Sequence, residues 1–333
     1  MRTFIISAIV LFFWNDLVKA DDGSWTITQL SISYANHPVI NNSNEVVWAG
    51  AGGGIYSNKR GLLSSSGINP HLANSGEVVY ADWFSGPNWD LVSTKRGRLT
   101  SNGSIDINAS DFDVNSNGEV VYAIADTSGN LQVHSTVRGL ITKDSNNHYN
   151  PCINDKGEII YEEVVSGEGP AIVSTERGTL LLQEGEGAVP MGLNNKGEFC
   201  FSGSLQIPGS SPPYYTSPHV FSSQHGAVID DPNQYQWDGS INDKETIVWG
   251  DASGNVYEGN WFPDLSIVNE TNGFTLEWTT NSPSLSVEYT TNLFEATSWN
   301  QLSGSIVTNK GNFREKIGSP NHAEFFRLCK VLP

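Results

Sequence analysis

The stretch INDKGEIIY (residues 153–161) decides the fold, because related copies of it recur six times along the chain. Each copy begins with an apolar residue and a polar turn that usually ends in glycine, and it closes with an apolar, mostly β-branched run and an aromatic residue. Asparagine and glycine suit a turn that needs positive φ, and the following run suits a buried strand. The copies occupy residues 40–48, 72–80, 114–122, 153–161, 193–201 and 241–249.

A second pattern follows the first at a fixed distance. It reads LVSTKRGRLT at 91–100, VHSTVRGLIT at 133–142 and IVSTERGTLL at 172–181, with a degenerate copy at 55–64. An Arg-Gly turn between two apolar runs predicts a β-hairpin whose glycine takes the unusual backbone angle. Three or four short strands in about 40 residues, without a helical pattern, predict the blades of a β-propeller.

We therefore expect an all-β fold with a six-bladed propeller. An unrecognised unit in the long fifth segment would make seven blades, and an open β-solenoid is the competing fold. The sixth unit lacks the Arg-Gly hairpin, and residues 25–33 precede the first unit where an outer strand is needed. This N-terminal strand is expected to complete the last blade, so that the sheet ring has no open edge.

The first 20 residues read as a secretory signal peptide: a basic residue, an apolar run that is short for a membrane span, and small residues before Asp21. An uncleaved membrane anchor is the alternative. The chain carries 18 basic and 36 acidic residues, which disfavours nucleic acid as a partner. We expect a secreted, extracellular or periplasmic protein with no later membrane span. Its oligomeric state is left open.

The repeats resemble the HAF-type extracellular repeats of secreted bacterial propellers, a likeness that rests on the IN-x-x-GE-V-V units. The likeness covers about residues 40–250 and implies export and a propeller, but no shared catalytic set. We place the propeller at residues 21–264. Residues 265–333 alternate apolar and polar positions and resemble a fibronectin type III-like module. That likeness rests on L-x-W at 276–278, V-x-Y-T-T-N-L at 287–293, Trp299 and the final F-F-R-L at 325–328. The resemblance implies a small antiparallel β-sandwich.

Glutamate and arginine recur with the two patterns. Glu77, Glu119 and Glu158 open the strand runs, and Arg96, Arg138 and Arg177 occupy the hairpin turns. Arginine presents a planar fork that suits a carboxylate, so we expect each pair to join within or between blades. A residue repeated in most blades is structural rather than catalytic. The three cysteines fit neither a zinc site nor a disulfide framework; Cys152 and Cys200 are expected to be buried free thiols, with a bridge between them as the alternative.

No catalytic residue, metal site or cofactor is predicted. The chain has no nucleophile, zinc-protease or phosphate-loop motif, and no two histidines have a metal-binding spacing. Weak calcium binding stays possible because several aspartates fall in expected loops, although none forms a calcium loop. These aspartates are Asp106, Asp111, Asp113, Asp230 and Asp231.

The loops that interrupt the repeat carry the functional signal, because function in a propeller lies on such loops. They hold aromatic residues beside carboxylates and amides, a combination that suits the flat apolar face and the hydroxyls of a sugar. Packing between blades is the alternative role of these rings. The candidate ligand-binding residues are Trp83, Phe84, Trp89, Tyr214, Tyr215, Tyr235 and Trp237.

The sequence thus favours an exported, non-catalytic binding or surface-associated protein whose partner is a polysaccharide or a cell-surface component. A polysaccharide-active enzyme, either a hydrolase or a lyase, is the second reading, and a structural or protein-interaction scaffold is the third. Glycoside hydrolysis needs two carboxylates about 5–9 Å apart. Its candidates here are Asp82, Asp90, Asp231 and Asp238.

Overall fold

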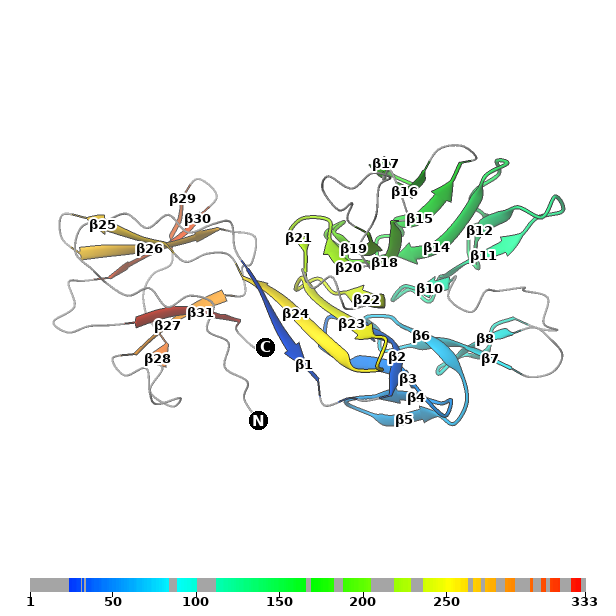
Figure 1. The fold of residues 1–333 in the computed structure, drawn as a ribbon, viewed down its shortest axis with the longest axis horizontal. Coiled ribbons are helices and arrows are strands. Elements are labelled where there is room, and N and C mark those ends of the chain that lie inside the picture. The colour runs from blue at the N-terminus through cyan, green and yellow to red at the C-terminus, as the bar shows by residue number, and fades with distance from the viewer. Residues whose placement is uncertain are drawn as a thin grey trace, which may run out of the picture. The chain divides into compact units, whose positions relative to one another are not determined.

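The computed structural model describes residues 24–30, 32, 34–83, 89–100, 112–165, 169–182, 188–204, 219–228, 236–262, 266–270, 273–279, 285–290, 300–301, 307–309, 312–317 and 325–330. Within them every helix or strand is a β-strand (Figure 1). None of these residues belongs to a helix that is long and apolar enough to cross a membrane. The chain divides into two compact units, Ile27–Gly259 and Asn260–Pro333 together with the residues up to Thr26.

Six four-stranded sheets, the blades, form the first unit. Blade 1 contains β2 (Ala35–Ile40), β3 (Val46–Gly50), β4 (Ile55–Ser57) and β5 (Gly61–Ser64). Blade 2 contains β6 (Ile68–Leu72), β7 (Val78–Asp82), β8 (Asp90–Ser93) and β9 (Gly97–Arg98). Blade 3 contains β10 (Phe112–Val114), β11 (Val120–Ala125), β12 (Leu131–Ser135) and β13 (Gly139–Leu140).

Blade 4 contains β14 (Asn147–Ile153), β15 (Ile159–Val164), β16 (Pro170–Ser174) and β17 (Gly178–Leu182). Blade 5 contains β18 (Val189–Leu193), β19 (Phe199–Gly203), β20 (His219–Ser222) and β21 (Gly226–Ala227). Blade 6 contains β22 (Gln236–Ile241), β23 (Thr246–Asp251), β24 (Val256–Phe262) and β1 (Ser24–Gln29). The first strands β2, β6, β10, β14, β18 and β22 contact one another in a closed ring. The six-bladed propeller is confirmed, and neither a seventh blade nor an open solenoid is formed.

The N-terminal strand supplies the outer edge of the last blade. Figure 1 shows β1, in blue, alongside β24, in yellow, and the two strands are neighbours in one sheet. The backbone N–H of Leu30 donates to the carbonyl of Val256 at 2.8 Å, and that of Ala35 donates to the carbonyl of Gly254 at 3.0 Å. Residues from the two ends of the propeller sequence therefore share one blade. In blade 6, β1 takes the place of the outer strand that follows the Arg-Gly turn in the other blades.

The two ends of the blades differ. In an antiparallel blade, the turn between strands one and two and the turn between strands three and four lie at the same end. In this propeller that end, here the repeat face, carries the short repeated turns. The opposite end, here the variable face, carries the connections between strands two and three and between successive blades. The described strand ends that flank the long connections 83–89, 99–111, 183–188, 204–218 and 228–235 all lie at the variable face.

One asparagine organises the repeated turn in every blade except blade 2. The Oδ1 of Asn154 accepts hydrogen bonds from the backbone N–H groups of Lys156 and Glu158, both at 3.1 Å. Its Nδ2 donates to the carbonyl of Asn194 in the next blade at 3.2 Å. The same two backbone donors are satisfied by Asn41, Asn115, Asn194 and Asn242. The same donation to the next blade is made by Asn115, Asn194 and Asn242. We call these asparagines the clamp; blade 2 has Ala73 in its place.

The repeated glutamates and arginines pair inside their own blades. The Nε of Arg177 lies 2.6 Å from Oε1 of Glu158, and the Oγ of Ser174 donates to the same oxygen at 2.6 Å. The Oγ of Ser174 also accepts from the backbone N–H of Arg177 at 3.2 Å, so one hydroxyl holds both the turn and the carboxylate. The equivalent Arg–Glu distances are 2.6 Å for Arg60–Glu45, 2.7 Å for Arg96–Glu77 and 2.6 Å for Arg138–Glu119.

Blades 5 and 6 depart from this pattern together. His225 stands where the other hairpins have arginine, and Glu245 occupies the glycine position of its turn with φ of 61°. From there its carboxylate reaches Lys196 at 2.6 Å and His225 at 3.5 Å in blade 5. Burial acts to raise the pKa of Glu245, but the hydrogen bonds from His225 and Lys196 outweigh it and leave that pKa below its ordinary value. A pairing between blades thus replaces the pairing within a blade.

The hydrophobic core of the propeller lies between neighbouring blades. One cluster joins Val47 and Ile55 of blade 1 to Val78 and Tyr80 of blade 2, and further clusters follow around the ring. Cys152 and Cys200 are buried free thiols. Burial raises the pKa of both, so neither is a reactive thiolate.

The second unit contains two sheets. The first has the order β25 (Ser266–Glu270), β26 (Gly273–Thr279), β30 (Asn312–Ile317) and β29 (Val307–Asn309). The other has the order β28 (Asn300–Gln301), β27 (Leu285–Thr290) and β31 (Phe325–Lys330). A buried cluster contains Phe262, Leu276, Trp278, Val287 and Leu328. The likeness of this unit to a fibronectin type III module stays a prediction, and the predicted signal peptide lies outside the described residues.

The clamp predicts a specific cost of substitution. Asn194→Ala leaves the part-buried N–H group of Lys196 and the buried N–H group of Glu198 without their acceptor, so the free energy of unfolding should fall by about 1–3 kcal/mol. The matched control is Asn117→Ala in the equivalent turn of blade 3, where the exposed side chain donates to the carbonyl of Asp155 but accepts from neither of the two backbone donors of the turn. Urea unfolding followed by tryptophan fluorescence measures both. Equal losses for the two variants would show that the clamp adds nothing.

Candidate functional site

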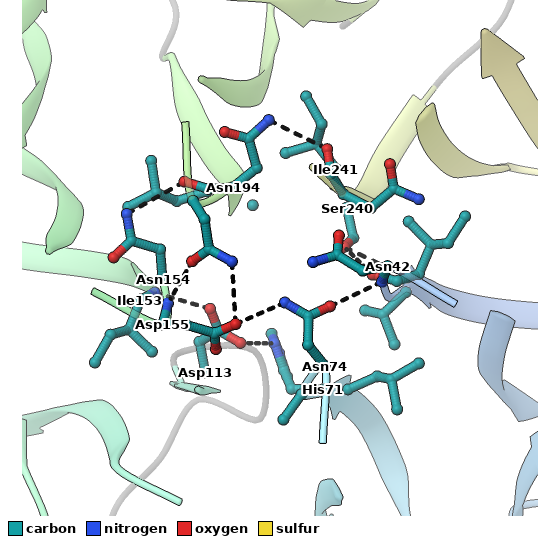
Figure 2. Close-up of a pocket in the computed structure, with 18 of the residues that line it drawn as sticks. Asn42, His71, Asn74, Asp113, Ile153, Asn154, Asp155, Asn194, Ser240 and Ile241 are labelled. Atoms are coloured by element: carbon teal, nitrogen blue, oxygen red, sulfur yellow. Dashed lines mark hydrogen bonds and ion pairs between the residues drawn. The ribbon is translucent and has the colours of Figure 1, made fainter. Parts of the chain in front are cut away.

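The channel at the centre of the propeller carries one polar side chain from each blade at its repeat-face end. Each of these residues directly follows the clamp position of its blade. Figure 2 shows several of them turned toward one another around a central opening. They are Asn42, Asn74, Ser116, Asp155, Asn195 and Asp243.

Hydrogen bonds join these six residues from blade to blade. The backbone N–H of Asp155 donates to Oδ1 of Asn195 at 2.8 Å, that of Asn195 donates to Oδ1 of Asp243 at 2.7 Å, and that of Asp243 donates to Oδ1 of Asn42 at 2.8 Å. The Nδ2 of Asn74 reaches past Ser116 to Oδ2 of Asp155 at 2.8 Å (Figure 2). The carboxylates at this end are therefore already occupied by amide donors.

Asp155 shows the electrostatic result. Burial acts to raise its pKa, but hydrogen bonds from the Asn74 side chain, the Ser116 backbone N–H and the Asn195 side chain outweigh burial. The pKa of Asp155 consequently lies below its ordinary value. Donors that favour the ionised carboxylate stabilise the charged form without a metal ion.

The opposite half of the channel is shaped by bulges in the first strands. His37, Asn69 and Asn150 adopt φ of 47–48°, each directly before a proline, and the strand register shifts at these points. The Nδ1 of His37 lies 3.0 Å from Oδ1 of Asp238. This pair joins blades 1 and 6, and no sequence pattern signals it because the two residues are far apart in the chain.

A second histidine lies deeper in the channel. The Nδ1 of His71 is 3.2 Å from Oδ1 of Asp113, and Oδ2 of Asp113 accepts the backbone N–H of Ile153 at 2.8 Å. Asp113 lies in β10 rather than in a loop, and it is not a free calcium ligand. The spaces in the two halves of the channel hold about 50 and 60 Å³. One or two waters fill such a space, and a sugar ring does not fit.

Among the predicted binding residues whose side chains the structure describes, Trp83 has the more exposed ring, and it directly follows β7 on the variable face of blade 2. Its side chain is 65% exposed, and its ring centroid lies 6.1 Å from that of Trp89 with an interplanar angle of 43°. The carboxylate of Asp82 lies beside it: Oδ2 accepts from the Oγ of Ser66 at 2.8 Å, and Oδ1 accepts from the backbone N–H of Trp83 at 2.9 Å. We call Trp83, Trp89, Asp82 and Ser66 the aromatic surface.

The carboxylates that the sequence suggests for glycoside hydrolysis differ in burial and in their partners. Asp82 and Asp90 are cross-strand partners in β7 and β8. Asp90 is only 1% exposed, forms an ion pair with Arg98, and accepts from the Oγ1 of Thr100 at 3.1 Å. Asp238 pairs with His37, and Asp231 lies outside the described residues.

The other predicted ligand-binding residues are not described at the side-chain level. Trp237 lies in β22, but its side chain is outside the described set. The remaining predicted ligand-binding residues outside the described set are Phe84, Tyr214, Tyr215 and Tyr235. The structure therefore brings Trp83 and Trp89 together and leaves the rest of the predicted aromatic set as a prediction.

No protein-family model matches the chain, and no curated protein matches its sequence. Several solved structures match the chain at low identity. A Trichoderma reesei enzyme of carbohydrate-active family AA12 is 11% identical, with a TM-score of 0.47 over 74% of this chain and 100% of that one. A putative gluconolactonase is 11% identical, with a TM-score of 0.45 over 74% and 95%. Virginiamycin B lyase from Staphylococcus aureus is 8% identical, with a TM-score of 0.41 over 71% and 99%.

The lowered pKa of Asp155 predicts a stability difference that depends on pH. Asp155→Asn replaces an acceptor oxygen with a donor facing Asn74 and Asn195, so the variant should be about 1–3 kcal/mol less stable at pH 7. A carboxylate whose folded pKa is depressed stabilises the fold above its unfolded pKa of about 3.9 and loses that contribution as pH falls through the folded value. The difference should therefore shrink at pH 3.

Urea unfolding of the wild type and the variant at both pH values measures this effect. Asp126→Asn is the control, because Asp126 is exposed and its Oδ1 accepts only local backbone N–H groups. A difference for Asp155→Asn that is the same at pH 7 and pH 3 would contradict the assignment.

Proposed function

We propose that this protein is an exported, non-catalytic binding protein that holds a glycan, or a glycan-bearing cell-surface component, on the variable face of its propeller. The observation that carries the proposal is the aromatic surface of blade 2. An exposed indole offers a flat apolar face for a sugar ring, and the neighbouring carboxylate and hydroxyl match sugar hydroxyl groups. An indole that is 65% exposed has no role in the core of the blade.

The division between the two faces supports this location. The repeat face repeats the same short turns, and their polar groups serve the clamp and the Arg–Glu pairs. The variable face carries connections that differ in length from blade to blade, and the predicted aromatic residues all fall in or beside them. Loops that vary on a rigid scaffold are where binding residues are found.

The charges around the site favour binding over catalysis. A glycosidase needs one carboxylic acid and one carboxylate that both reach the substrate. Asp90 is buried and ion-paired with Arg98, Asp238 is paired with His37, and the channel carboxylates accept amide donors. Among the described candidates, Asp82 alone lies beside an exposed ring.

A polysaccharide-active enzyme is the second candidate, and one observation favours it. Asp82 and Asp90 are directly opposite across β7 and β8, and such partners have Cβ atoms about 4.5–5.5 Å apart. Side chains with this Cβ spacing can bring their carboxyl groups to the about 5–5.5 Å that a retaining glycosidase needs. Catalysis by this pair requires Asp90 to leave Arg98 and become accessible to the substrate.

The aromatic surface predicts the effect of removing one ring. The wild type should be retained on at least one member of a panel of immobilised polysaccharides, and Trp83→Ala should weaken its binding about tenfold or more, because stacking on the indole is lost. Trp83→Phe keeps a ring and should lose less. The matched control is Val137→Ala, which shortens a side chain that is 71% exposed on the repeat face and should leave retention unchanged.

The same incubations separate the two candidate functions. New reducing ends or unsaturated products, lost in Asp82→Asn, would establish the enzyme and overturn the binding proposal. Retention without products supports binding alone. If neither the panel nor a preparation of cell-surface glycans retains the wild type, the glycan proposal is wrong and a protein-interaction role replaces it.

A further inference from the structure

We infer that Asp144, His148 and Glu163 form a binding site for a divalent transition-metal cation on the variable face of blade 4. The three side chains converge although the sequence motifs do not point to them. His148 is the second residue of β14, and Glu163 is its cross-strand partner in β15. Asp144 lies in the connection that enters the blade. One ligand atom from each residue lies within 4.8 Å of the other two.

The histidine is buried and its hydrogen bonding fixes its tautomer. The Nδ1 of His148 lies 3.3 Å from the carbonyl of Leu131 in blade 3. A carbonyl only accepts, so Nδ1 carries a proton, and in the neutral tautomer that results Nε2 presents its lone pair. The side chain is fully buried, and Nε2 makes no hydrogen bond to any residue that the structure describes.

This lone pair faces two carboxylates. The Nε2 of His148 is 3.4 Å from Oδ2 of Asp144 and 3.7 Å from Oε1 of Glu163. Two negative charges and a lone pair directed into one point repel one another unless a proton or a metal cation lies between them. No lysine or arginine side chain of the described residues pairs with this group.

A cation at this point has suitable ligands and dimensions. Imidazole nitrogen and carboxylate oxygen are ligands that Zn²⁺ and neighbouring divalent metals accept. Tetrahedral zinc with bonds of about 2.0–2.1 Å places its ligand atoms about 3.3–3.4 Å apart, close to the distances from Nε2. Three protein ligands leave one position for solvent, and Asp144, with its side chain 51% exposed, opens the site to it.

The hydrogen bonds made by the three proposed ligand residues match those that surround metal ligands in proteins. Metal-binding histidines commonly donate their other ring N–H to a backbone carbonyl, as His148 does to Leu131. Asn146 orients both carboxylates: its Nδ2 donates to Oε1 of Glu163 at 2.9 Å and its backbone N–H donates to Oδ1 of Asp144 at 2.8 Å. The ring of Tyr161 packs edge-on against His148, with centroids 5.1 Å apart.

A second cluster provides the contrast. Glu198, His225 and Glu245 also bring three potential ligand atoms within 4.8 Å. There the Nζ of Lys196 lies 2.6 Å from Oε1 of Glu245, so a side-chain cation already balances the carboxylate. The cluster in blade 4 lacks this compensation among the described residues, which is why the inference concerns blade 4 alone.

Metal titration of the full chain, purified without a histidine tag and treated with chelator, tests the site. The wild type should take up one equivalent of Zn²⁺ measured by calorimetry, and one equivalent of Co²⁺ with the visible absorption of a protein-bound, low-coordinate ion. Glu163→Gln should abolish saturable binding. Asn146→Ala should weaken it about tenfold, because outer contacts typically contribute 10–100-fold. His134→Gln removes a nearby imidazole outside the cluster and should bind as the wild type does.

No His148 variant is used, because that side chain is fully buried and its loss would affect folding, whereas Glu163→Gln and Asn146→Ala change partly exposed residues. Saturating Zn²⁺ should also raise the thermal midpoint of the wild type and leave that of Glu163→Gln unchanged. Absence of a one-to-one uptake by the wild type, or equal uptake by Glu163→Gln, would overturn the inference. His148 would then carry a second proton and form an ion triad with the two carboxylates.

Discussion

The closed ring depends on the clamp asparagines and the backbone donors that they satisfy. A tight turn at the inner edge of a blade buries N–H groups that no strand can pair, and each unpaired group costs about 1–3 kcal/mol. The asparagine side chain accepts two of these donors within its own turn and donates to the carbonyl of the next blade. One side chain therefore fixes both the turn and the spacing between blades.

This constraint explains why the repeat face is uniform and the channel is narrow. The residue after each clamp position lies near the propeller axis, and in most blades its side chain forms hydrogen bonds with the equivalent residues of other blades. In blades 4, 5, 6 and 1 aspartate and asparagine alternate at this position, and Asp155 accepts from Asn74 and Asn195. A channel closed in this way has room for waters but none for a sugar, and ligand binding is left to the other face.

Much of this architecture can be predicted from the sequence, because most blades form the same turn and the same hairpin with the same residue types. The blade number and the absence of helices follow from periodicity. The clamp was not evident, since asparagine in a turn has a sufficient local explanation in its backbone preference. The pairing of Glu245 with Lys196 and His225 is not evident either. Glu245 lies one position before the repeated glutamate, so in the aligned repeats the sixth copy simply lacks that glutamate.

The site residues also fall into those that the sequence reveals and those that it does not. Trp83 and Trp89 are visible in the sequence because they interrupt a repeat, whereas His148 and Glu163 belong to the repeated strands and interrupt nothing. Their meeting depends on strand register: β14 and β15 bring His148 opposite Glu163 only because the bulge at Asn150 shifts the pairing between Tyr149 and Cys152. A bulge that adjusts the first strand to the channel thus also determines which side chains meet on the variable face. Polar clusters created by register need the three-dimensional structure, and in a repeat protein they are where function can be built without disturbing the repeat.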